Sequence, residues 1–193
     1  MAIFPYVSES DLKLADRDII KSGFNLHKIT AYSPKTARVS QAMGGHLRFT
    51  SSLNPRLREL AILQVAYTGR SPYEWVHHLE IAEDLGINEN DLRAISAESE
   101  GQHSDLDQIS RAVLKAAREM TQGITSSPAT MKQLQASLSR EALVDLIYAI
   151  GFYVGFIRIT ASLQIEVESG YQKYLNRFPM PDRAVDWMQH DGI

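Results

Sequence analysis

Four residues of this 193-residue chain have types and spacing that could support acid–base chemistry: Glu59, Glu74, His77 and His78. Glu74 and His78 are four residues apart, so on a helix they share one face. Glu59 lies in an apolar run, where a carboxyl group is rarely buried without a partner. Burial favours the neutral form of such a group, and a neighbouring carboxylate raises the basicity of a histidine. We therefore expect Glu59, Glu74 and His78 to be catalytic, with either Glu59 or His78 as the proton donor.

Two predicted helices joined by a tight turn would position these residues. An Asn-Pro pair at residues 54–55 predicts the start of the first helix, which covers about residues 54–68. A Ser-Pro pair at residues 71–72 predicts the start of the second helix, which ends at Gly86. The start of the second helix directs free backbone amides and a partial positive charge towards one place. We therefore expect a small anionic substrate there, in contact with Ser71, Tyr73, Trp75 and His77.

Structural roles offer an alternative explanation for the two acids. Ser71 and Glu74 have the spacing of a capping box, in which the Glu side chain accepts a hydrogen bond from the backbone amide of the cap residue. Glu59 could form a buried ion pair with Arg56 or with Arg58, and such pairs are often purely structural. Both explanations remain open at the level of the sequence.

Metal binding is another use for the same side chains. The segment from Glu74 to His77 has the Glu-x-x-His spacing of di-iron bundles, which need two such segments, and this chain contains one. Adjacent His77 and His78 lack the His-Glu-x-x-His spacing of zinc enzymes. They could instead face solvent (His77) and pack in the core (His78). We expect no metal and no cofactor.

The motifs around these residues resemble a known family. Three segments carry the resemblance: Arg58-Glu59-Leu60, then Tyr73-Glu74-Trp75-Val76-His77-His78, then Ala82 with Gly86. Over residues 53–95 they are similar to the carboxymuconolactone decarboxylase family, which includes the alkylhydroperoxidase D-like proteins. The resemblance implies a multi-helix, all-α bundle and a homo-oligomer, anywhere from a dimer to a hexamer.

The peroxidase branch of that family has an upstream Glu followed by a Cys-x-x-Cys-x-x-x-His segment. In this chain Glu59 and His78 match its Glu and His, whereas Ser71 and Glu74 occupy the cysteine positions. Because the chain has no cysteine, dithiol peroxidase chemistry by the family's route is excluded. The resemblance therefore implies decarboxylation, or a related lyase or isomerase reaction, on a small organic acid or lactone. Two alternatives remain: a peroxidase relative without its thiols, and a non-catalytic oligomer that binds a small ligand.

The composition fits one soluble domain spanning residues 1–193. The hydrophobic content is 44% and the net charge is -3, which gives no sign of a nucleic-acid partner. The lack of cysteine suits a reducing compartment. The N-terminus shows no basic segment followed by a long apolar run, as a secretory signal would have. We expect a cytoplasmic protein with no membrane partner.

The rest of the chain is a series of predicted helices between extended arms at residues 1–7 and 170–193. No alternating strand pattern persists, so the predicted fold class is all-α. The apolar run at residues 146–157 is shorter than the roughly 20 residues of a membrane span and predicts a buried helix. On it, Gly151 and Gly155 would let another helix approach closely, in the core or at a subunit interface. The predicted helices outside the motif cover residues 9–22, 34–50 (softened at Gly44-Gly45), 88–99, 104–122, 127–138 and 140–168.

Overall fold

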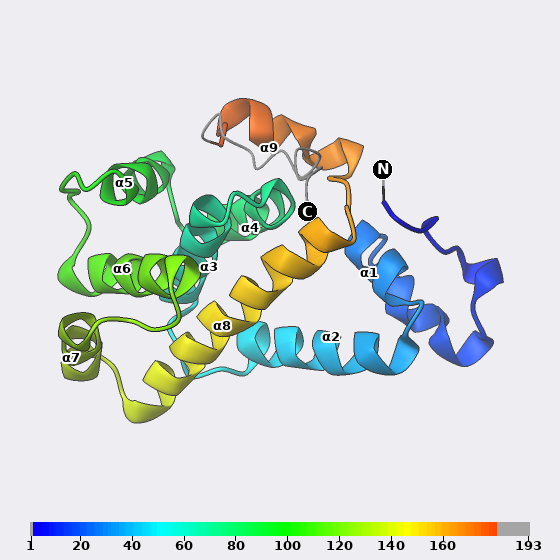
Figure 1. Ribbon diagram of the computed structural model, residues 1–193, viewed down its shortest axis with the longest axis horizontal. Coiled ribbons are helices and arrows are strands. Elements are labelled where there is room, and N and C mark those ends of the chain that lie inside the picture. The colour runs from blue at the N-terminus through cyan, green and yellow to red at the C-terminus, as the bar shows by residue number, and fades with distance from the viewer. Residues whose placement is uncertain (1, 181–193) are drawn as a thin grey trace, which may run out of the picture.

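The computed structural model describes residues 2–180, and these form an all-α fold with no strand among them, as predicted. Figure 1 shows α8 running diagonally across the molecule, with α2 below it and α3 and α4 behind it. The elements in chain order are 3-10 helices η1 (Glu9–Asp11) and η2 (Leu14–Ile20), then α1 (Asn25–Thr30), α2 (Pro34–Phe49), α3 (Pro55–Thr68), α4 (Pro72–Asp84), α5 (Glu89–Ser99), α6 (Gln108–Gln122), α7 (Pro128–Ser137), α8 (Arg140–Ser162), η3 (Ser169–Tyr171) and α9 (Gln172–Arg177).

Helix α3 lies at the centre of the core. It packs against α4, α5, α6 and α8, and its residues from Leu57 to Ala66 are all buried. The predicted start is confirmed, because the side chain of Asn54 accepts hydrogen bonds from the backbone amides of Arg56 and Leu57. A helix that is buried on every side must also bury its polar residues, so Arg58, Glu59 and Gln64 each need a partner inside the protein.

A tight turn joins α3 to α4 and brings their buried faces together. Arg70 in this turn has a φ of 51°, in the left-handed region that most side chains avoid. The backbone amide of Ser71 then donates to the carbonyl of Ala66, and the Ser71 hydroxyl accepts from the amide of Glu74 as the cap of α4. This antiparallel pair sets Glu59 on α3 opposite His78 on α4.

The helix predicted at residues 9–22 is wrong. The segment instead forms η1 and η2, followed by the short helix α1, which was not predicted. Its two buried apolar residues are adjacent, Ile19 and Ile20, so they do not make the stripe that would bury an α-helix. Helix α2, in contrast, continues without a break through Gly44 and Gly45.

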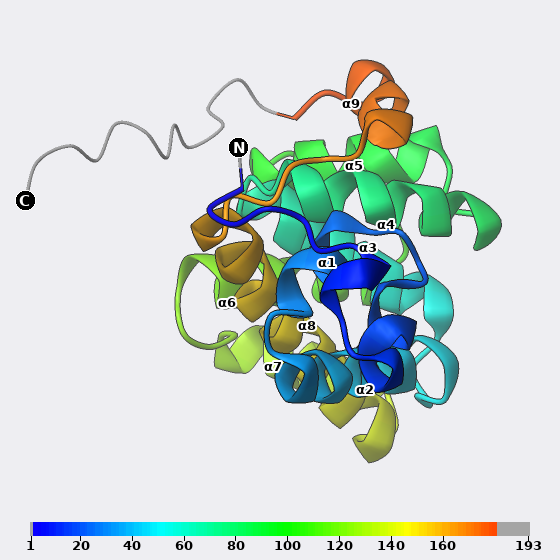
Figure 2. The ribbon, with the colours of Figure 1, turned by 90° about the vertical axis from the view of Figure 1, so that its right-hand side faces the viewer.

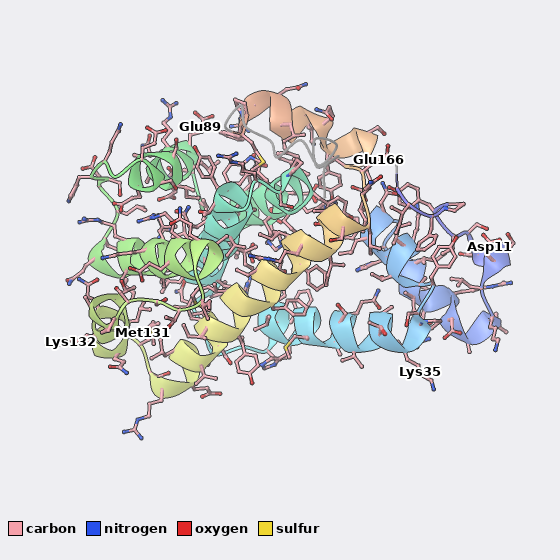
Figure 3. The ribbon with its side chains drawn as sticks, in the orientation of Figure 1. Asp11, Lys35, Glu89, Met131, Lys132 and Glu166 are labelled. Atoms are coloured by element: carbon pink, nitrogen blue, oxygen red, sulfur yellow. The ribbon has the colours of Figure 1, made fainter. Side chains whose placement is uncertain are left out.

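The N-terminal segment lies against the chain's own end of α8. The amide of Ile3 donates to the carbonyl of Leu163, and the amide of Glu166 donates to the hydroxyl of Tyr6. Figure 2 shows this segment crossing the near face in front of α1, and Figure 3 marks Glu166 where the two segments meet. The predicted arm therefore packs within the protomer.

The C-terminal part differs from the prediction at both of its boundaries. Helix α8 ends at Ser162 rather than at residue 168, because Gln164 adopts a left-handed φ of 51° and its amide turns back to the carbonyl of Ala161. The region predicted as an irregular arm contains η3 and α9. The rest of that predicted arm, residues 181–193, lies outside the described residues.

Helix α8 is less buried than its sequence predicts. It has a mean hydropathy of 1.8 over its most apolar window of 18 residues, and only 28% of that window is buried. By length and composition the helix could also cross a membrane, but one face packs against α3, α4, α6 and α7 as a core helix does. The opposite face exposes Val144, Tyr148 and Ile159.

The small-residue stripe of α8 has no partner helix within the described residues. An ideal Cβ atom built at Gly151 or at Gly155 would meet no atom within 4 Å. Tight packing inside the protomer, one of the two explanations for this stripe, is therefore not what the structure shows. The explanation that remains is contact with a second chain.

We predict that the protein is a homo-oligomer in which a second copy covers the exposed face of α8. Gly155→Leu should leave the protomer folded, since the new side chain meets open space, but should separate the subunits. Light scattering at micromolar concentration measures the mass, with Lys132→Leu on exposed α7 as a control for an added surface leucine. A parent protein that is strictly monomeric would contradict the prediction.

Candidate functional site

A cavity of about 500 Å³ lies where α2, α3, α4 and α8 meet η2 and α1. Its volume is in the usual range for sites that bind small molecules. Its wall contains several phenylalanine and tyrosine rings, with ionisable groups that come mainly from α3 and α4. The residues that carry the argument below are Arg48, Glu59, Tyr73, Glu74, His77, His78, Tyr153 and Tyr171.

A buried chain of charged side chains ends at this cavity. The Nδ1 atom of His78 lies 2.6 Å from Oε2 of Glu59, and Nε of Arg58 donates to Oε1 of Glu59 at 2.8 Å. Arg58 also donates to the carbonyls of Leu47 and Arg48 at the end of α2. The ion pair of Glu59 with Arg58 is thus confirmed, but Glu59 also bonds His78 and is not only structural.

Glu59 is ionised, contrary to the expectation from its apolar neighbours. Burial alone raises the pKa of Glu59, but the effects of His78 and Arg58 together outweigh burial, so the pKa lies below its usual value. An ionised carboxylate only accepts hydrogen bonds, so His78 carries a proton on Nδ1. The prediction that Glu59 is a neutral acid is wrong, because the sequence did not show how close Arg58 and His78 lie to its carboxylate.

Glu74 has the properties that were predicted for Glu59. Burial raises its pKa, more strongly than His78 and His77 lower it. Its Oε2 lies 3.7 Å from Nε2 of His78, too far for a hydrogen bond, and its buried Oε1 has no partner among the described residues. Glu74 is therefore a buried carboxyl group on the cavity wall that favours its neutral form.

The capping-box explanation of Glu74 is also wrong. The hydroxyl of Ser71 does accept from the backbone amide of Glu74, which confirms half of the motif. The reciprocal bond is not formed, since the backbone amide of Ser71 donates to the carbonyl of Ala66 instead. The side chain of Glu74 is thus not used as a helix cap, and it lines the cavity instead.

Tyr153, on α8, belongs to the site but was missed in the sequence. Its ring meets the ring of His78 edge-on, with centroids 4.7 Å apart. Burial, followed by the charges of Glu74 and Glu59, raises the pKa of Tyr153. Nothing in its local spacing marked it, because it lies 75 residues after His78 and only the packing of α8 on α4 brings the two together.

His77 occupies a second polar cluster at the cavity. It is buried rather than solvent-facing, and its Nε2 lies 2.8 Å from Oε2 of Glu168. The ring of Tyr171 lies over it at 4.0 Å and that of Tyr73 at 4.5 Å. Oε1 of Glu168 accepts hydrogen bonds from the amide of Asn25 and from the hydroxyl of Tyr73. The cluster therefore connects the start of α1 to α4.

Glu168 is the strongest acid of this cluster. Burial opposes its ionisation, but hydrogen bonds from His77 and from the amide of Asn25, with smaller contributions, hold its pKa at about 2. Sequence reasoning missed Glu168 because it lies 91 residues after His77 and neighbours no motif residue in the chain.

The structure places two predicted substrate-binding residues outside the cavity wall. Trp75 is buried, donates from Nε1 to the carbonyl of Phe178, and lines a separate pocket of about 310 Å³. Ser71 caps α4. Both follow from the helical period, since positions 71 and 75 share one face and positions 74, 77 and 78 share another.

The described residues contain no group of three His, Asp or Glu side chains placed to hold a metal ion. Instead, His78 lies between two carboxyl groups whose pKa values shift in opposite directions: that of Glu59 is lowered and that of Glu74 is raised.

The low pKa of Glu168 predicts a pH-dependent contribution to stability. A carboxyl group whose pKa falls from 4.5 to about 2 on folding stabilises the folded state above pH 4.5, and this stabilisation is lost as the pH falls towards 2. Glu168→Gln should lower the free energy of unfolding at pH 7 by about 1–2 kcal/mol, allowing for partial exposure. The difference from the parent should close in acid.

Urea unfolding at a series of pH values measures this difference. Asp105→Asn, at an exposed loop carboxylate, is the matched control. Glu168→Gln could instead destabilise the protein equally at about pH 2.5 and at pH 7. That result would show that the charge of Glu168 is not the cause.

Residues 34–119, which include α3, the turn and α4, match the model of the carboxymuconolactone decarboxylase family. Among curated proteins no match is found.

Solved structures with the same fold include an uncharacterised peroxidase-related protein from Ralstonia eutropha, at 17% identity and a TM-score of 0.73, covering 88% of this chain and 94% of that one. Another is the debrominase Bmp8, as a cysteine-to-alanine variant in complex with 2,3,4-tribromopyrrole, at 16% identity and a TM-score of 0.74, covering 92% and 100%. A peroxidase-related protein from Silicibacter has 18% identity and a TM-score of 0.69, covering 88% and 92%. Residues 34–119 of this chain thus match the carboxymuconolactone decarboxylase family, and the chain has the fold of the alkylhydroperoxidase D-like helical proteins.

Proposed function

We propose that the cavity is an active site for acid–base chemistry on a small organic acid or lactone, with decarboxylation as the leading reaction. The observation that supports this proposal most is the buried chain from Arg58 through Glu59 to His78. It ends at a cavity of suitable size, beside a carboxyl oxygen of Glu74 that has no hydrogen-bond partner among the described residues. Buried polar groups normally have partners, so an unpaired carboxyl oxygen on a cavity wall favours a role towards a ligand.

His78 is the proton-transfer residue in this proposal. Glu59 accepts from Nδ1 and fixes the tautomer, so in the neutral imidazole the lone pair is on Nε2, the nitrogen nearer to Glu74. This is the arrangement of a base held by an orienting carboxylate. Arg58 keeps Glu59 ionised and is a positioning residue.

The decarboxylation step needs the site to hold charge briefly and then to supply a proton. The carbon–carbon bond to the substrate carboxylate breaks, and carbon dioxide leaves. The electron pair stays on the substrate as an enolate. Protonated His78 gives its Nε2 proton to the carbon and regains one from water. In an isomerisation, neutral His78 would take a proton from one carbon and return it to another.

The cavity wall supports a compact, ring-shaped acid as substrate. Phe152 and Phe156 lie 4.5 Å apart at the wall, and exposed Arg48 adds a cation there. In the debrominase of similar fold, the bound molecule is a small planar ring. A carboxylated lactone has both the ring and the anionic group that such a wall favours.

Two other functions use the same cavity. A peroxidase relative would need a thiol, and this chain has none. A binding protein without catalysis would use the aromatic wall but would have no need of a base fixed by Glu59. The buried chain of charges therefore favours the enzyme. The cytoplasmic location stays a prediction.

We predict that Glu59→Gln and His78→Ala each lower the rate of carbon dioxide release from a carboxy-lactone by about 10²–10⁴-fold, since each removes part of the proton-transfer pair. Glu83→Gln, at an exposed site on α4, is the control and should keep the parent's rate. Circular dichroism shows whether each variant folds. Normal turnover by both folded variants would contradict the site.

We also predict that the purified, metal-free protein does not consume alkyl hydroperoxide with a dithiol reductant faster than a protein-free control. No thiolate is available to attack the peroxide oxygen. Peroxide consumption coupled to thiol oxidation measures the activity. A rate that rises with protein concentration would favour the peroxidase alternative instead.

A further inference from the structure

Two polar groups at the cavity have no hydrogen-bond partner among the described residues. One is Oε1 of Glu74, which is buried and unpaired. The other is the hydroxyl of Tyr153, whose interactions in the structure are contacts of its ring with His78, Phe152 and Phe156 and the electrostatic influence of nearby charges. Both residues line the cavity.

Other tyrosines on the same wall are already bonded. The hydroxyl of Tyr73 donates to Glu168 and accepts from the amide of Leu26, and the hydroxyl of Tyr171 donates to Glu80. Tyr153 thus differs from Tyr73 and Tyr171 in having a free hydroxyl beside the proposed base.

We propose that Glu74 and Tyr153 form a two-donor oxyanion site next to His78, which restricts the substrates to compounds with a carbonyl oxygen conjugated to the reacting carbon. This inference rests on the proposed function of His78. The substrate must then carry a carbonyl oxygen next to the reacting carbon, a requirement that a carboxylate group alone does not meet.

Burial favours the protonated, donating form of both groups, because it raises the pKa of Glu74 and is the largest cause of the raised pKa of Tyr153. A protonated carboxyl group and a tyrosine together make the oxyanion site of ketosteroid isomerase, so this pair of donors has a known chemical use.

The two donors flank the base. Glu74 approaches Nε2 of His78 to 3.7 Å, and the Tyr153 ring meets the imidazole edge-on. In this proposal a substrate carbon near Nε2 places its neighbouring oxygen between the two donors, since both line the same cavity as His78. Hydrogen bonds aimed at an oxygen that gains charge in the transition state lower the barrier more than bonds to the neutral substrate.

The electrons move as follows in an enolisation. The Nε2 lone pair of His78 takes a proton from the carbon next to the carbonyl group. The electrons of that carbon–hydrogen bond form a carbon–carbon double bond, and the carbonyl π electrons move to oxygen. That oxygen accepts hydrogen bonds from Glu74 and Tyr153. In a decarboxylation, the electrons of the breaking carbon–carbon bond follow the same path.

A phenol that changes colour on ionisation tests the pair without turnover. Para-nitrophenol absorbs at longer wavelength as the oxyanion, so absorbance reports both its binding and its ionised fraction. The parent protein should bind the ionised probe in preference to the neutral one. Tyr153→Phe and Glu74→Leu should each weaken that binding by about 10–100-fold, the usual effect of a hydrogen bond to a charged group. Glu74→Gln keeps one donor and should weaken binding less.

The control is Tyr148→Phe, which removes a hydroxyl from the exposed side of the same helix and should bind the probe like the parent. Tyr153→Phe deletes a single oxygen atom, so it keeps the test decisive if Glu74→Leu fails to fold. Equal binding of the ionised probe by the parent and by folded Tyr153→Phe would overturn the proposal, as would a preference for the neutral probe.

The result separates this inference from the proposed function. Turnover that depends on His78 but not on Tyr153 would reject the oxyanion site and keep the acid–base site. Binding of the oxyanion that depends on Tyr153 and Glu74, in a protein with no turnover on any carboxy-lactone, would support the oxyanion site while the proposed reaction fails.

Discussion

The structure of the site depends on the need to compensate one buried negative charge. Glu59 lies inside the central helix α3, where an unpaired carboxylate would cost several kcal/mol or more. Arg58 and His78 compensate it, at 2.8 Å and 2.6 Å. Arg58 in turn bonds the carbonyls at the end of α2, so the same interaction joins α2, α3 and α4 around the cavity. Removing any one partner would leave the others buried without compensation.

The same contacts also make the pKa values of the two carboxyl groups of the site differ. Glu59 bonds both His78 and Arg58 and has a lowered pKa, whereas Glu74 has only a distant contact with His78 and favours the neutral form. Pairs of titratable groups whose surroundings shift their pKa values in opposite directions are typical of acid–base sites. The chain has no cysteine, but the cavity still contains ionisable side chains that could transfer protons. The second cysteine position of the family pattern holds Glu74, a group with a different chemical use.

Helix α8 connects this site to the outer surface. Its inner face supplies Tyr153 to the cavity, and its outer face exposes apolar side chains around Gly151 and Gly155. An apolar face on a soluble protein usually marks a contact surface. Because both faces belong to one rigid helix, association of two copies would also limit the movement of Tyr153 against His78.

The sequence by itself determined the elements that are set by local chemistry. The caps Asn54 and Ser71 and the apolar runs fixed α3 and α4, and the spacing of Glu59, Glu74 and His78 singled out three residues that the structure brings together at the cavity. Helical periodicity failed where the apolar residues form no stripe, as in η2, where a left-handed residue ends a helix, as at Gln164, and in the segment that holds the short elements η3 and α9.

The tertiary structure decided which acid is neutral and which distant residues join the site. The pKa of a buried carboxyl group depends on charges within a few ångströms, and those come from other helices as well as from the chain neighbours. Arg58 is adjacent in sequence to Glu59, yet only the fold turns its side chain back onto that carboxylate. Tyr153 reaches the cavity 75 residues after His78, and Glu168 bonds His77 of the cavity wall across 91 residues, separations at which spacing carries no information.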